Sequence, residues 1–101
     1  MRFSAFVGAA EKMFYVYILE CFCDNKANSF YVGYTHNLQK RVQKHQNRQA
    51  KTTKKFDKIK LVYYEACLNK TDARKRENQL KTGFGRGYLK KRVANYLSGV
   101  S

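Results

Sequence analysis

Acidic residues are scarce in this sequence. Its 101 residues include 7 Asp and Glu against 21 Lys and Arg, which gives a formal net charge of +14. Such a density of one charge costs stability through self-repulsion unless an anionic partner offsets it. The composition therefore indicates a polyphosphate partner, and nucleic acid is the first candidate.

Long hydrophobic runs and paired cysteines are also missing. No apolar stretch approaches the length that spans a bilayer, and residues 6–10 are too few for the apolar part of a secretory signal. The cysteines Cys21, Cys23 and Cys67 form an odd set without the spacing of a zinc site, which favours reduced thiols. We expect no membrane partner and a cytoplasmic location.

The chain has room for one domain. With 44% hydrophobic residues it can form a single core, and it contains no proline and no internal repeat. Residues 1–12 lack strand or helix periodicity, so we expect a flexible N-terminal extension there and the domain over residues 13–101. The high charge predicts a monomer without an obligate protein partner.

The first half of the chain predicts a hairpin followed by a helix. Phe14–Phe22 is nearly all apolar, aromatic or β-branched, which is typical of a central strand covered on both faces. A turn over residues 24–28 and a second strand over 30–35 should follow. A helix is expected over about 37–48, with Thr35, His36 or Asn37 as its N-cap, and then a basic loop to residue 58.

The second half predicts one more strand and two helices. The strand should cover residues 60–66, and Thr71-Asp72 should begin a helix that reaches about Lys81. Gly83, Gly85 and Gly87 should break the chain before a last helix over about 88–97, which places Leu89, Val93, Tyr96 and Leu97 on one face. The expected fold class is α+β, a small three-stranded antiparallel sheet flanked by about three helices in ββα-β-αα order.

Positive charge gathers in two segments. Residues 40–60 hold nine Lys or Arg and one acid, and residues 74–92 hold eight and one. Solvated helix faces usually interleave acids for i,i+4 pairing, and these segments barely do, so nucleic-acid contact is the favoured interpretation. On charge alone, Lys44, Lys54, Lys55 and Arg86 are the candidates for contacts with the nucleic-acid backbone.

One acidic residue is predicted to face the protein interior, where burial of a carboxylate costs free energy. Ala73, Glu77 and Leu80 fall on the inward stripe of the predicted second helix. A buried carboxylate needs a metal ion or a cation to neutralise it. A Mg²⁺ ligand and a structural salt bridge to Arg41 or a neighbouring Arg are equally compatible with this pattern.

Arg41 and His45 lie four residues apart and share a face of the first helix. A guanidinium can hold two phosphate oxygens and an imidazole can hydrogen-bond a water, so the pair suits a phosphodiester. An ordinary surface pair is the other interpretation.

Tyrosines and one glycine mark the first two strands. Tyr15 and Tyr17 share a face of the first strand, as do Tyr31 and Gly33 of the second. Core packing is the ordinary role of such tyrosines, but it does not explain a glycine inside so short a strand.

These residues carry a resemblance to a known family. Tyr15-Val16-Tyr17 and Tyr31-Val32-Gly33 resemble the two half-motifs of the GIY-YIG nuclease superfamily, at that family's spacing. The next helix has the family's Arg-x-x-x-His spacing at Arg41 and His45, and residues 73–81 resemble the helix that bears its metal-binding Glu, here Glu77.

The resemblance covers about residues 14–97. It is strongest to the short stand-alone branch, which is related to the nuclease domain at the N-terminus of an excinuclease. Tyr15 replaces the first glycine of the motif name, and Asn95, the candidate for the family's late Asn, is predicted to face outward.

The resemblance implies a divalent-metal-dependent endonuclease that hydrolyses phosphodiester bonds, with DNA as the expected substrate and DNA repair or recombination as the expected setting. Mg²⁺ or Mn²⁺ would bind Glu77. Tyr17 would be the general base, which requires nearby positive charge to lower the phenol pKa. Arg41 would stabilise the transition state. The implied catalytic set is Tyr17, Tyr31, Arg41, His45 and Glu77, with Tyr31 and His45 orienting water and phosphate and Gly33 as a structural motif residue.

Two alternatives remain open. A nucleic-acid-binding module of the same fold could cut slowly or not at all. A basic assembly protein bound to a large RNA would have no metal-dependent behaviour, whereas a metal that binds the native state must raise its melting temperature.

Overall fold

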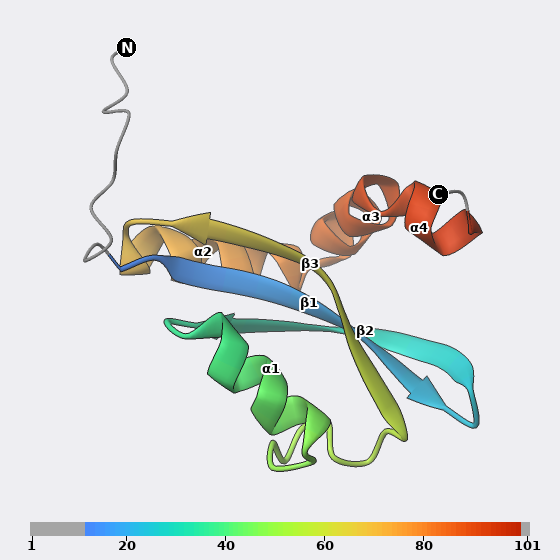
Figure 1. The fold of residues 1–101 in the computed structure, drawn as a ribbon. Coiled ribbons are helices and arrows are strands. Elements are labelled where there is room, and N and C mark those ends of the chain that lie inside the picture. Colours follow the sequence, from blue (N-terminus) through green and yellow to red (C-terminus); the bar gives the residue numbers. More distant parts are fainter. Residues whose placement is uncertain (1–11, 100–101) are drawn as a thin grey trace.

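A computed structural model describes residues 12–99, apart from the side chains of residues 27 and 28. Except for Lys12, the expected N-terminal extension lies outside the described residues. The elements, in chain order, are β1 (Phe14–Cys23), β2 (Lys26–Thr35), α1 (Leu38–Gln46), β3 (Lys58–Cys67), α2 (Lys70–Leu80), α3 (Gly83–Arg92) and α4 (Ala94–Ser98) (Figure 1). This is an α+β fold, as predicted.

The three strands form one antiparallel sheet in the order β2-β1-β3. β1 is central and every residue from Val16 to Cys21 is buried, which confirms the prediction from its continuous apolar run. Glu20 is the acid in this run, at 5% exposure, and it accepts a hydrogen bond from the Tyr96 hydroxyl of α4. This bond connects the C-terminal helix to the middle of the sheet.

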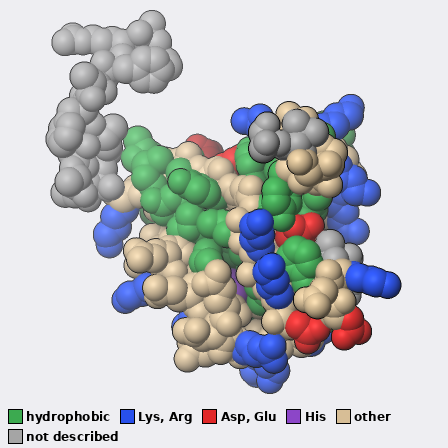
Figure 2. Space-filling view, turned by 45° about the vertical axis from the view of Figure 1, so that its right-hand side comes forward, with side chains coloured by type: hydrophobic (Ala, Val, Ile, Leu, Met, Phe, Trp, Pro, Cys, Tyr) green, Lys and Arg blue, Asp and Glu red, His purple; other side chains and the backbone are tan. Residues whose placement is uncertain are grey.

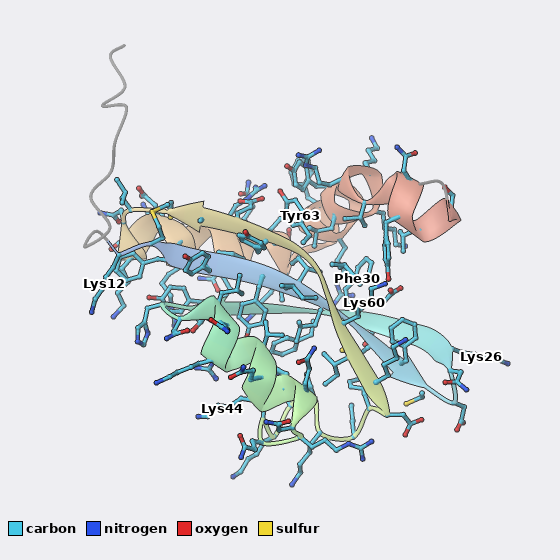
Figure 3. The ribbon with its side chains drawn as sticks, in the orientation of Figure 1. Lys12, Lys26, Phe30, Lys44, Lys60 and Tyr63 are labelled. Atoms are coloured by element: carbon cyan, nitrogen blue, oxygen red, sulfur yellow. The ribbon has the colours of Figure 1, made fainter. Side chains whose placement is uncertain are left out.

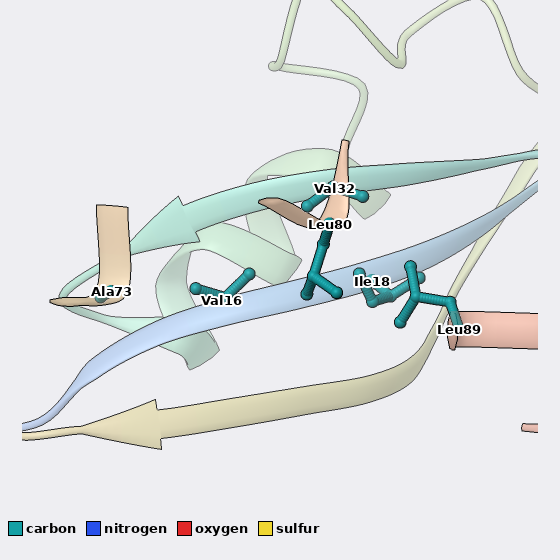
Figure 4. Close-up of a cluster of buried hydrophobic side chains, with 6 residues drawn as sticks. All are labelled: Val16, Ile18, Val32, Ala73, Leu80 and Leu89. Carbon is teal, nitrogen blue, oxygen red and sulfur yellow. The ribbon is translucent and has the colours of Figure 1, made fainter. Parts of the chain in front are cut away.

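Helices cover both faces of the sheet, so there are two clusters of buried side chains. On one face Val16, Ile18 and Val32 pack with Ala73 and Leu80 of α2 and Leu89 of α3 (Figure 4). On the other, Tyr17, Leu19 and Cys21 pack with Phe56 and Ile59, next to α1 (Figure 1). Alternate residues of β1 therefore enter different clusters, and Tyr17 lies on the α1 side.

The hairpin turn is tighter than the sequence predicts. The structure confines the turn to Asp24 and Asn25, with φ angles of 53° and 64°, and β2 starts at Lys26 rather than at Phe30. Asp and Asn tolerate this left-handed backbone, and paired positive φ angles match the twist of a two-residue hairpin. The turn predicted from polar composition, over residues 24–28, is therefore too long.

The structure also shows where the first two helices begin. Asn37, one of three candidates, is the N-cap of α1, and its side chain accepts from the backbone N–H of Lys40. The cap of α2 is Asn69, whose side chain accepts from the N–H of Asp72, so the helix begins at Lys70, before the predicted Thr71.

The glycines after α2 do not break the chain but lie inside α3. Thr82 caps this helix by accepting from the N–H of Gly85. A Cβ at Gly85 would overlap the backbone of Leu80, so the glycine allows α3 to start directly against the end of α2. The single last helix predicted over 88–97 is also wrong: α3 ends at Arg92, and Val93 separates it from α4.

Candidate active site

Tyr17 lies at the centre of the sheet, on the face covered by α1. Its side chain is 1% exposed, and it pairs across the sheet with Gly33 of β2. A Cβ at residue 33 would overlap the ring and hydroxyl of Tyr17. The glycine inside the short strand is thus explained by the space that this ring requires.

A buried chain of hydrogen bonds starts at the Tyr17 hydroxyl. The hydroxyl oxygen lies 2.8 Å from Nε2 of His45, and Nδ1 of His45 lies 2.6 Å from Oγ1 of Thr53. His45 and Thr53 are both 0% exposed. His45 therefore does not form a surface pair with Arg41, which is exposed on the same helix.

Burial sets the protonation states of the hydrogen-bonded Tyr17 and His45 side chains. It raises the pKa of Tyr17 well above the usual phenol value, with a second contribution from Tyr31, and the nearby Arg41 opposes this shift only in part. Burial, followed by Arg41, lowers the pKa of His45 below its usual 6.5. The expected depression of the phenol pKa is absent because desolvation outweighs the cation, and both side chains are neutral at pH 7.

Tyr31 stands beside both members of the pair. Its ring centroid is 6.3 Å from that of Tyr17 and 5.2 Å from that of His45. Tyr31 is half-buried, so it connects the buried pair to the surface.

Arg41 is an exposed cation close to this pair. It affects the pKa values of both Tyr17 and His45, which places its guanidinium within electrostatic reach of them. It lines a pocket of about 190 Å³ at the end of β2. The other lining residues are Thr35, His36, Asn37, Lys40 and Lys44.

Glu77 is inward-facing, as predicted, at 9% exposure. Its ion-pair partners do not include Arg41. They are Arg74 of the same helix, whose Nε lies 3.8 Å from Oε1, and Lys81 at the end of that helix, whose Nζ lies 3.1 Å from Oε2. Glu77 also contributes to raising the pKa of Tyr17. The Glu77 carboxylate and the Arg41 guanidinium, on helices that cover opposite faces of the sheet, therefore both act electrostatically on the Tyr17 phenol.

Comparison with known families identifies the family of the chain. The sequence model of a family described as the GIY-YIG catalytic domain matches residues 13–99. The chain belongs to the GIY-YIG family. That membership gives it a nuclease-type fold and confirms the resemblance of the two half-motifs on β1 and β2.

Proteins named UPF0213 are among the curated relatives. One from Clostridium perfringens is 46% identical over 70 residues, which cover 68% of this chain and 71% of the relative. One from Staphylococcus saprophyticus is 44% identical over 69 residues, 67% of this chain and 79% of the relative. No solved structure matches the chain at a significant level.

The GIY-YIG assignment makes a divalent ion relevant to this site. Within residues 12–99 there is no group of three or more His, Cys, Asp or Glu side chains that could hold a metal. Mg²⁺ commonly keeps several waters and binds through one or two carboxylates together with substrate phosphates. Glu77 fits this kind of site, since its carboxylate is nearly buried and both neutralising cations are on side chains at least half exposed.

The four predicted backbone contacts are all exposed and lie on two sides of the molecule. Lys44 is on α1 (Figure 3). Lys54 and Lys55 follow in the loop before β3, whereas Arg86 is on α3. Figure 2 shows Lys and Arg side chains around the edges of one face and between its two hydrophobic patches. In the described part of the chain no helix is long and apolar enough to cross a membrane.

Sequence reasoning misses two residues of the candidate site. Thr53 lies in the predicted basic loop, and no signal in the sequence distinguishes it from the adjacent Thr52. Lys81 is predicted only as a helix end, although its position four residues after Glu77 is the spacing of a helical ion pair. Asn95 is exposed on α4, as predicted.

Proposed function

We propose that this GIY-YIG protein is a divalent-metal-dependent endonuclease that hydrolyses phosphodiester bonds in nucleic acid, with DNA as the expected substrate. The observation that supports it most directly is the buried hydrogen bond between Tyr17 and His45, beside Arg41 and Glu77. A tyrosine that served only the core would not need a fully buried imidazole as its partner.

The proton path follows from this geometry. In the tautomer with the proton on Nδ1, His45 donates to Oγ1 of Thr53 and its Nε2 accepts the Tyr17 hydroxyl proton, which leaves a lone pair of the phenol oxygen for a water molecule. As Tyr17 accepts the proton of the attacking water, its own proton passes to Nε2 of His45. The raised phenol pKa opposes a free phenolate, and a neutral imidazole next to the hydroxyl makes that species unnecessary.

Arg41 carries the electrostatic part of the proposal. The non-bridging oxygens of a phosphate in its pocket would gain negative charge as water attacks, and a guanidinium can hold two of them. One well-placed donor of this kind contributes about 3–4 kcal/mol to lowering a barrier. Tyr31, half-buried beside Tyr17 and His45, orients the water or the phosphate.

Glu77 is the proposed metal ligand. Its carboxylate would hold a divalent ion, which would supply positive charge to stabilise the leaving oxygen. Lys44, Lys54, Lys55 and Arg86 would contact the backbone on either side, and their contribution should fall steeply with salt.

A non-catalytic binding module is the second candidate. It is favoured by one specific observation, namely that Glu77 already has two cationic partners and therefore does not require a metal to be neutralised. Such a module would bind nucleic acid through the same basic segments and leave it intact.

A cleavage assay separates the two candidates. Wild type, Tyr17→Phe, Glu77→Gln and Arg41→Gln proteins are incubated with plasmid, single-stranded and branched DNA, and with RNA, each with Mg²⁺, Mn²⁺ or EDTA. Nucleic-acid binding is measured in parallel. The nuclease proposal predicts metal-dependent cleavage by the wild type that the three variants lose, by about 100-fold or more, while they still bind.

Lys75→Gln is the matched control, because it removes a charge from the exposed side of α2 without touching Glu77. Its cleavage rate should stay close to wild type. Binding without cleavage by the wild type in every condition would refute the nuclease proposal and leave the binding module.

A further inference from the structure

A second basic pocket lies on the other side of the sheet edge, between β2 and α3. It has a volume of about 400 Å³. Its walls combine apolar side chains, among them Phe30 and Leu89, with the cations Lys81, Arg86 and Lys90. Among the lining residues that the structure describes, none is acidic.

This composition suits a nucleotide unit of a polymer. Three cations around one cavity favour a phosphate, and an aromatic ring and an aliphatic side chain offer a surface for a base or a sugar. Figure 3 shows Phe30 extending from β2 toward α3, where the cations are located.

The pocket shares one residue with the candidate active site. Tyr31 lines it and also packs beside Tyr17 and His45. Thr35, four residues further along β2, lines the pocket of Arg41. Four strand residues span about 13 Å, so the two basic pockets lie at opposite ends of one short stretch of the sheet edge.

Lys81 contacts Glu77 and also lines the pocket between β2 and α3. Its ammonium lies 3.1 Å from Glu77 and its side chain lines the pocket between β2 and α3. At 51% exposure the lysine side chain is long and free enough to leave the carboxylate. An anion in the pocket and the Glu77 carboxylate therefore compete for one ammonium group.

We propose that the pocket between β2 and α3 binds the backbone phosphate of a nucleotide next to the one being cleaved, and that Lys81 moves from Glu77 to this phosphate. Nucleic acid would then release the carboxylate for the metal ion. The inference rests on the proposed nuclease function, and it adds that the substrate prepares the metal site.

Linkage gives this proposal a measurable form. If bound nucleic acid removes Lys81 from Glu77, it must raise the affinity for the metal, and the metal must raise the affinity for nucleic acid by the same factor. An exposed ion pair of this kind corresponds to a change of about two- to fivefold in metal affinity.

The first experiment measures Mn²⁺ binding by electron paramagnetic resonance, without nucleic acid. Lys81→Gln should bind Mn²⁺ about two- to fivefold more tightly than the wild type, because the competing ammonium is gone. Lys75→Gln removes an equal charge from the same helix without a contact to Glu77, and it should change the affinity less. Equal effects of the two variants would show general charge repulsion and overturn the role of Lys81.

The second experiment adds a short thymidine oligonucleotide, in a Tyr17→Phe background that prevents cleavage. The oligonucleotide should tighten Mn²⁺ binding when Lys81 is present and leave it unchanged in Lys81→Gln. Lys90→Gln should weaken oligonucleotide binding more than Lys91→Gln, since Lys91 is exposed on the same helix but does not line the pocket. Equal effects of these two variants would overturn the phosphate site.

Failure of this inference is distinguishable from failure of the proposed function. If Glu77→Gln binds Mn²⁺ as the wild type does and nothing is cleaved, the nuclease proposal fails. If cleavage and Mn²⁺ binding both depend on Glu77, but Lys81→Gln matches Lys75→Gln, only the inference fails.

Discussion

Removing one hydroxyl group should destabilise this protein measurably. Tyr17→Phe deletes the atom that lies 2.8 Å from Nε2 of His45 and keeps the aromatic ring. His45 is 0% exposed, so no bulk water is available to replace the lost partner. The imidazole would be left with an unsatisfied ring nitrogen, whichever of its two nitrogens carries the proton.

The expected cost follows from that burial. Leaving a buried polar group without its hydrogen bond costs about 1–3 kcal/mol. In a domain of this size each kcal/mol lowers the melting temperature by about 4–8 °C. The variant should therefore melt at least about 4 °C below the wild type, and its free energy of unfolding should fall by more than about 1 kcal/mol.

Urea denaturation followed by circular dichroism measures this difference directly. Tyr15→Phe is the matched control, because it removes a hydroxyl from the same strand that has no hydrogen-bond partner among the described residues. It should change the free energy of unfolding by less than about 0.5 kcal/mol. If both variants lose the same stability, the buried Tyr17–His45 bond does not have the strength that the proposed proton path assumes.

Three further outcomes are expected. Gly33→Ala should lower the free energy of unfolding by about 1–3 kcal/mol in the same denaturation assay, because its Cβ would overlap Tyr17, whereas Gly87→Ala, with open space around its Cβ in α3, should be neutral or stabilising. Leu80→Ala should cost about 2–5 kcal/mol, since this side chain is 0% exposed in the cluster under α2; a loss below about 1 kcal/mol would contradict that packing. The stability of the wild type should decrease as pH falls below 6.5, because the unfolded chain binds a proton that the buried, neutral His45 does not; pH-dependent melting should show a smaller decrease in His45→Gln, and an equal decrease would contradict this role of His45.

The fold is predictable from the sequence where one physical rule dominates. The apolar run of β1 requires burial on both faces, and this makes it the central strand. Predictions fail where a local contact overrides composition. Gly85 is helical because its missing side chain lets α3 meet the end of α2, and that close approach cannot be read from the glycine spacing.

The candidate site also has features that the sequence predicts and features that it does not. The inward position of Glu77 follows from helical periodicity, whereas the register that pairs Tyr17 with Gly33 is visible only in the structure. The burial of His45 does not follow from periodicity either, because it depends on where the loop after α1 folds back. The direction of the phenol pKa is also inaccessible from sequence, since it reflects a balance between burial and the Arg41 charge.

Thr53 gives the basic loop a second constraint. It closes the hydrogen-bond chain on His45 and is followed directly by Lys54 and Lys55. Replacing this loop by one of a different length, in order to alter nucleic-acid specificity, would displace Thr53 together with Lys54 and Lys55. Redesign of this surface should therefore keep the backbone path up to Thr53 and vary only the side chains that face solvent.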